Sequence, residues 1–318
     1  MLDQILVPLD GSSLAECVLP HVAAVARPFG GQITLVRVVE RQEARGGGEA
    51  LDPLDWQMRK SEAEAYLEEV QRRLKKMDLP VRRELLVGKA AERIIEYAQS
   101  EDVDLIVLSS HGRSGLSPWN INSVVQKVIL RAYVPTLIVR AYNAASCELR
   151  DLSYEQIMLP MDGSRRAESI LPLATGIADY HPCRLLLAHV VSKPSVPRRT
   201  PLTDEEKALV ENLTELNRQA GRSYLSQLEE RVGEAAETHL LEGESTPVAL
   251  HRLVQEEDVD LVILCAHGYS GEAQWPYGSV ALNFIAYGSK PLLILQDVPR
   301  EGVPETPAER VAHEQKGH

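Results

Sequence analysis

Apolar positions along this chain form short continuous runs separated by stretches in which apolar residues recur every three or four positions. The short runs, rich in Val, Ile and Leu, predict strands at residues 4–9, 32–39, 81–87, 105–109 and 136–140. The periodic stretches predict helices at residues 14–29, 57–77, 90–100 and 120–131. Strands this apolar are buried on both faces, which predicts a parallel sheet between two layers of helices.

The second half of the chain repeats the first. Ile5–Ser12 reads ILVPLDGS and Ile157–Ser164 reads IMLPMDGS, at an offset of 152 residues. Asp102–Leu105 and Asp258–Leu261 both read DVDL, at an offset of 156. The repeat predicts two tandem doubly wound domains, residues 1–143 and 154–297, each with a five-stranded parallel sheet.

Three segments depart from the simple alternation. Residues 40–56 contain three consecutive glycines and predict a mobile loop, and residues 192–204 predict another. Residues 298–318 place prolines among charges without apolar periodicity, which predicts a disordered tail. The second copy has a longer helix at residues 203–232, whose predicted apolar face consists of Leu209, Leu213, Leu216, Leu228 and Val232.

Composition narrows the classes of function. The net charge is −12. Residues 1–150 hold 19 Lys+Arg and 20 Asp+Glu, whereas residues 151–318 hold 15 Lys+Arg and 26 Asp+Glu. This acidic balance argues against nucleic-acid binding. No apolar run approaches the ~18 residues of a membrane span, and the N-terminus lacks the pattern of a signal peptide. The four cysteines have no CxxC spacing, so we expect free thiols and a cytoplasmic protein.

Candidate binding residues gather where the predicted strands end. Asp10 and Asp162 follow the first strand of each copy, and a His-Gly pair, His111-Gly112 or His267-Gly268, follows the fourth. Each pair leads into a helix that opens at Asn122-Ser123 or Gly278-Ser279. Glycines and a helix N-terminus together expose backbone N–H groups that hold phosphate. The Walker pattern GxxxxGK[ST] is absent from the sequence, which favours holding a nucleotide over rapid hydrolysis.

These motifs resemble the universal stress protein family in its tandem form, over residues 1–297. The family signature G-x2-G-x9-G-[S/T] falls on Cys265, Gly268, Gly278 and Ser279 in the second copy, where only the first glycine is replaced. In the first copy it falls on Ser109, Gly112, Asn122 and Ser123, with two glycines replaced, one by Asn, which tolerates positive φ. The resemblance implies an adenine nucleotide alpha hydrolase-like fold and ATP binding.

The resemblance also implies the roles of individual residues. Asp10 and Asp162 would contact ribose or a nucleotide-bound Mg²⁺, and Val38 and Val190 would lie against adenine. We expect ATP or AMP to bind mainly in the second domain of a stress-response regulatory protein. The expected nucleotide-binding residues are Pro160, Asp162, Val190, Gly268, Gly271, Gly278 and Ser279 in domain 2, and Pro8, Asp10, Val38, Gly112, Gly115, Asn122 and Ser123 in domain 1.

Other interpretations stay open. His111, His267 and Cys265 suit catalysis or simple packing, and the two aspartates suit ordinary Asp-Gly-Ser turns. Trp119 and Trp275 suit packing or a lid over the crevice. The protein is then a nucleotide-binding regulator with an unknown protein partner, an interaction scaffold without nucleotide, or a slow ATPase.

The last strand of each copy predicts how the domains assemble. Residues 135–140 and their equivalents 291–295 are apolar, and an apolar edge strand pairs with another chain unless it is covered. Members of the resembled family generally dimerise through this strand. We expect the two copies to pair here as an internal pseudo-dimer, with a homodimer also open, although each edge could instead be covered by its own linker.

Overall fold

The structure, a computed structural model, describes residues 2–40, 53–112, 121–141, 149, 151–192, 202–243, 245–269 and 276–297. Within these ranges the predicted α/β fold with parallel sheets flanked by helices is confirmed. The predicted tail at 298–318, and most of both predicted loops, lie outside the described residues.

Domain 1 has five parallel strands in the order β3-β2-β1-β4-β5. Their bounds are β1 Gln4–Pro8, β2 Gln32–Val39, β3 Val81–Val87, β4 Leu105–Ser109 and β5 Thr136–Val139. Helices α1 (Leu19–Ala26) and α2 (Pro53–Lys75) pack on one face, and α3 (Ala90–Ser100) and α4 (Ser123–Ala132) pack on the other. The strand order reverses between β1 and β4, where such sheets open a crevice.

Domain 2 repeats this arrangement in the strand order β10-β9-β6-β7-β8. Its strands are β6 Gln156–Pro160, β7 Arg184–Ser192, β8 Ala236–Gly243, β9 Leu261–Cys265 and β10 Leu292–Leu295. Its helices are α5 Arg165–Glu168, α6 Leu171–Tyr180, α7 Asp204–Val232, α8 Thr246–Glu256 and α9 Ser279–Tyr287. The second crevice therefore lies between β6 and β9.

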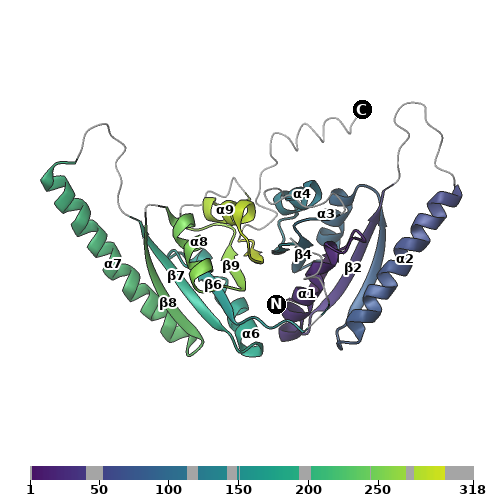
Figure 1. Cartoon of the computed structure of the whole chain (residues 1–318), viewed down its shortest axis with the longest axis horizontal. Coiled ribbons are helices and arrows are strands. Elements are labelled where there is room, and N and C mark those ends of the chain that lie inside the picture. Colours follow the sequence, from purple (N-terminus) through teal and green to yellow (C-terminus); the bar gives the residue numbers. More distant parts are fainter. Residues whose placement is uncertain are drawn as a thin grey trace.

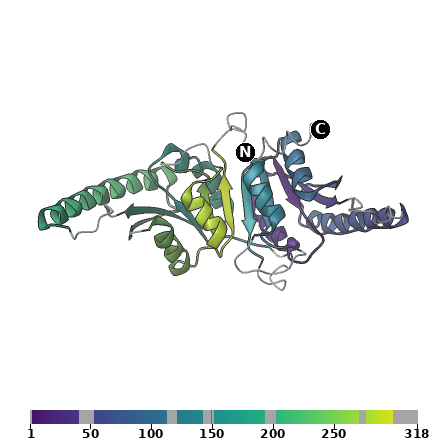
Figure 2. The same ribbon diagram turned by 90° about the horizontal axis from the view of Figure 1, so that it is seen from above.

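The two domains join edge to edge. Strands β5 and β10 pair antiparallel, with Leu292 opposite Ile138 and Ile294 opposite Thr136, so that one ten-stranded sheet runs through the molecule. Figures 1 and 2 show this joint in the middle, with α2 and α7 at opposite outer ends. Each apolar edge strand is thereby covered by the other, which removes two unpaired edges.

The first predicted helix, residues 14–29, is not continuous. It consists of a 3-10 turn (Ala15–Val18), α1 and a second 3-10 turn (Arg27–Phe29). Pro28 lacks the N–H that an α-helix needs, and Gly30 follows in the left-handed conformation at φ 66°. Leu14 occupies the N-cap position of the first 3-10 turn, and the Ser12 hydroxyl oxygen accepts from the Ala15 N–H at 3.1 Å.

Helices α2 and α4 also begin several residues away from their predicted starts. Helix α2 already begins at Pro53, inside the predicted loop 40–56, because proline suits the first helical position. Helix α4 begins at Ser123 rather than at residue 120, because the Asn122 side chain caps it.

The predicted apolar face of the long helix α7 is only partly buried. Leu228 is in the core, but Leu209 and Leu216 are 60% and 61% exposed and Leu213 is exposed as well. The helix has 29 residues, about 44 Å, whereas the nine-residue β7 spans only about 30 Å. Its N-terminal part therefore extends past the sheet (Figure 1), and the prediction is wrong for these three leucines.

The prediction of four free thiols is also wrong. Cys17 is disulfide-bonded, whereas Cys183 and Cys265 are free and buried. The cysteines therefore give no support to a reducing compartment. Among the described residues, no helix combines the length and the apolarity needed to cross a bilayer.

Candidate functional site

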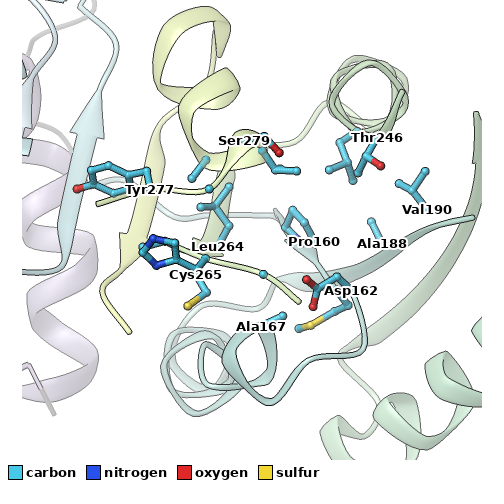
Figure 3. A pocket seen from close by; sticks show the side chains of 18 of the residues that line it. Pro160, Asp162, Ala167, Ala188, Val190, Thr246, Leu264, Cys265, Tyr277 and Ser279 are labelled. Atoms are coloured by element: carbon cyan, nitrogen blue, oxygen red, sulfur yellow. The ribbon is translucent and has the colours of Figure 1, made fainter. Parts of the chain in front are cut away.

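A crevice opens at the carboxyl ends of the strands in each domain, and the two differ in size. The domain 2 cavity has a volume of about 640 Å³, which is within the ~300–1,000 Å³ of small-molecule sites. The domain 1 cavity has about 120 Å³, well below that range. Figure 3 shows the larger cavity, with Thr246 and Val190 at one end and Tyr277 at the other.

The structure brings together most of the residues expected from the sequence. The larger cavity is lined by Pro160, Asp162, Val190, Gly268, Gly278 and Ser279. The smaller one is lined by Pro8, Asp10, Val38, Gly112 and Asn122, whereas Ser123 does not line it. Gly115, Gly271, Trp119 and Trp275 lie outside the described residues.

The aspartate after the first strand fixes the loop after the fourth. Asp162 Oδ1 accepts from the Ser164 N–H at 2.9 Å, and Oδ2 accepts from the Tyr269 N–H at 2.5 Å. A Cβ at Gly268 would lie 2.2 Å from Oδ2, so only glycine permits this approach. Asp10 repeats the pattern, with the Ser12 N–H at 2.9 Å and Gly112 equally close. The turn interpretation of both aspartates therefore holds.

The helix start opposite this loop distinguishes the two crevices. Asn122 Oδ1 accepts from the Val124 N–H at 2.9 Å, so the side chain caps α4 and lies inside the smaller cavity. At the matching position Gly278 has no side chain, and the first-turn amides of α9 are left for a ligand. The φ angles are −53° at Asn122 and −73° at Gly278, so tolerance of positive φ plays no part at this position.

The larger cavity holds few charged groups. Its titratable lining side chains are Asp162, Cys265, Tyr277 and the two histidines His189 and His267, and its described lining includes no Lys or Arg. Burial raises the pKa of the Cys265 thiol to about 11, so it stays protonated at neutral pH and is a poor nucleophile. An anion in this cavity would therefore be held by backbone amides and the helix N-terminus.

Sequence reasoning missed the partner of His267. Its Nδ1 lies 2.6 Å from Asp297 Oδ1, and the two side chains are only 1% and 6% exposed. Arg166 Nε lies 3.1 Å from the other oxygen of Asp297. In domain 1, His111 Nδ1 instead lies 2.9 Å from the Ser110 hydroxyl. These contacts fix the loop backbone. Because Asp297 is 30 residues from His267 in sequence, no local motif reveals the pair.

His189 also lines the larger cavity without having been expected there. Its Nδ1 lies 2.7 Å from the Met161 carbonyl oxygen. Because a carbonyl only accepts, Nδ1 must carry the proton of this bond. The contact ties the end of β7 to the residue before Asp162.

The described lining of the larger crevice offers Mg²⁺ a single carboxylate, that of Asp162. The described parts of the chain hold no group of three or more His, Cys, Asp or Glu side chains suited to a metal ion. Asp162 supplies one carboxylate, and Mg²⁺ is commonly held by one or two carboxylates together with substrate phosphates. Asp162 would therefore share such an ion with phosphate oxygens.

The fold and its paired crevices define a tandem doubly wound α/β protein. The chain belongs to the universal stress protein family, whose sequence profile matches residues 1–140 and 153–296. Universal stress protein MJ0531 of Methanocaldococcus jannaschii is 28% identical over 142 residues, 43% of this chain and 81% of that protein. Universal stress protein MJ0577 of the same organism is 26% identical over 159 residues, 45% of this chain and 98% of that protein.

A solved structure matches nearly the whole chain. The universal stress protein from Archaeoglobus fulgidus superposes with a TM-score of 0.65 at 17% identity, covering 94% of this chain and 100% of that one. At this identity the match establishes the fold, and both halves of the chain share it.

Proposed function

We propose that this protein binds an adenine nucleotide, ATP or AMP, in the domain 2 crevice. The observation that carries the proposal is the start of α9, where Gly278 leaves the helix N-terminus open to a cavity of about 640 Å³. A helix N-terminus beside a glycine loop favours phosphate through aligned N–H groups and the helix dipole. The resemblance in the signature residues supports adenine as the base.

The lining suggests one orientation of the ligand. Phosphates would lie between Gly268 and the Gly278-Ser279 helix start, where amides and the Ser279 hydroxyl gather. Asp162 would face the ribose or a phosphate-bound Mg²⁺. The base would lie at the far end, against Val190 and Thr246 (Figure 3).

We propose that binding occurs without a dedicated chemical step. Cys265 is held as a thiol, His267 is engaged by Asp297, and the described lining offers no Lys or Arg for transition-state charge. Nucleotide occupancy would instead change a surface that a partner protein reads. The antiparallel β5–β10 joint would serve as an internal pseudo-dimer, so that one chain supplies both domains.

Calorimetry on the full chain tests the binding. We expect a saturable heat with ATP and Mg²⁺, and displacement by AMP but not by GMP. Steady-state phosphate release at the level of a protein-free blank would agree with binding alone. Absence of heat at high micromolar ATP would overturn nucleotide binding and favour a scaffold. Turnover that disappears in Asp162→Ala would overturn the absence of a chemical step.

A further inference from the structure

Tyr277 is part of the domain 2 cavity, yet its hydroxyl group interacts with domain 1. Tyr277 lines the cavity and is 2% exposed. The hydroxyl donates to the Ile129 carbonyl oxygen of α4 at 2.9 Å. Figure 3 shows the Tyr277 hydroxyl turned away from the other labelled lining side chains. One side chain therefore connects a ligand cavity in one domain to a helix in the other.

The repeat shows that this contact is asymmetric. Ile129 in α4 and Ile285 in α9 occupy equivalent positions, 156 residues apart. Arg140 Nη2 of domain 1 donates to the Ile285 carbonyl oxygen at 2.7 Å, so both helices receive a donor from the opposite domain. Arg140, however, lines neither described cavity, and the domain 1 equivalent of Tyr277 is Ile121, which has no hydroxyl group. Among the described residues of the two cavities, Tyr277 alone donates in this way to a helix of the opposite domain.

We propose that Tyr277 couples nucleotide occupancy of domain 2 to the order of α4 in domain 1, an inference that rests on the proposed function. A ligand packed against Tyr277 would restrict the motion of this residue and hold its hydroxyl on the Ile129 carbonyl. Helix α4 carries exposed Gln126, Lys127, Leu130 and Arg131, which form the surface that would respond. Coupling of this kind is reciprocal, so loss of the contact must also weaken nucleotide binding.

Hydrogen exchange of α4 measures the coupling directly. In the wild-type chain, ATP with Mg²⁺ should slow amide exchange across residues 123–132. Tyr277→Phe removes one buried hydrogen bond, should abolish this slowing, and should weaken ATP binding by roughly two- to tenfold. Tyr287→Phe is the matched control, because Tyr287 is the last residue of α9 and its side chain is 63% exposed. It should leave both quantities unchanged.

The same measurements distinguish failure of the coupling from failure of nucleotide binding. If ATP binds the wild-type chain but α4 exchange does not change, or if Tyr277→Phe keeps the change, the coupling is wrong and the proposed function stands. If calorimetry on the same samples shows no ATP binding, both are wrong. Arg140→Gln loosens the domain joint without altering the cavity, and it should retain the ATP-dependent change in α4. Loss of the change in that variant would reassign the coupling from Tyr277 to the joint as a whole.

Discussion

The two crevices share their strands, their Asp-Gly-Ser turns and their His-Gly pairs, yet one encloses about 640 Å³ and the other about 120 Å³. The two crevices differ most clearly at the first residues of the helix opposite the glycine loop. In domain 1 Asn122 caps its own helix with a side chain, and in domain 2 Gly278 supplies none. The same amides that bind a phosphate also bind a capping carbonyl oxygen, so a good helix cap and a good anion site exclude each other.

The largest effect on ATP binding should come from replacing Gly268, whose backbone lies against the Asp162 carboxylate. Gly268→Val places a Cβ where Asp162 Oδ2 would be 2.2 Å away, and two backbone donors hold that carboxylate in place. We expect calorimetry to show no ATP binding. Gly112→Val is the matched control, because it meets Asp10 Oδ2 at the same 2.2 Å in the other domain. Both variants should lose ~1–3 kcal/mol of unfolding free energy, but only Gly268→Val should lose binding.

Exchanging the two helix-start residues should move the binding capacity. Asn122→Gly removes the cap and should give domain 1 a second, weaker ATP site, at a cost of a few tenths of a kcal/mol in stability. Gly278→Asn should weaken ATP binding by about tenfold or more, because an Asn cap competes for the first-turn amides. A Cβ at Gly278 would meet the Ala266 carbonyl oxygen at 3.4 Å, an ordinary contact. Unchanged affinity in Gly278→Asn would mean that those amides do not bind the ligand.

The charge difference between the domains leads to a metal prediction. The open crevice lies in the half with 15 Lys+Arg against 26 Asp+Glu, and Asp162 stands beside the proposed phosphates. Chelation of Mg²⁺ should therefore weaken ATP binding by about tenfold, whereas AMP, which lacks β- and γ-phosphates, should be little affected. Calorimetry with and without EDTA measures both ligands. An equal loss for AMP would place Mg²⁺ elsewhere than on the outer phosphates.

The smallest effect on ATP binding is expected at the first position of the loop signature, Cys265 in domain 2 and Ser109 in domain 1. With a pKa of about 11 rather than 9, the Cys265 thiolate fraction at pH 8 should be about a hundredfold below that of an ordinary cysteine. Alkylation followed by mass spectrometry should therefore be slow at pH 8 and accelerate as the pH rises toward 11. Because burial raises this pKa in the folded state, its contribution to stability is fully present below pH ~9 and is lost as the pH rises through about 11. Rapid labelling at pH 8 would contradict the buried thiol, and Cys265→Ser should leave ATP binding unchanged.

Particular residues show which features sequence could predict. The predicted bounds of β2, β3 and β4 match the observed ones. The apolar run of β4 is buried at every position, as a strand covered on both faces requires. The exposed leucines of α7 were mispredicted, because periodicity records a helix face but not the length of the sheet beneath it. The replacement of glycine by Asn122 was visible in the sequence. Its occupation of the crevice depends on a side-chain direction that only the structure provides.

The stoichiometry of ATP binding tests the central claim most directly. Native mass spectrometry of the wild-type chain with ATP and Mg²⁺ should show one nucleotide per chain, and Gly268→Val, but not Gly112→Val, should remove it. Two nucleotides of similar affinity, or one that persists in Gly268→Val and disappears in Gly112→Val, would contradict the account that Asn122 closes domain 1 and Gly278 opens domain 2.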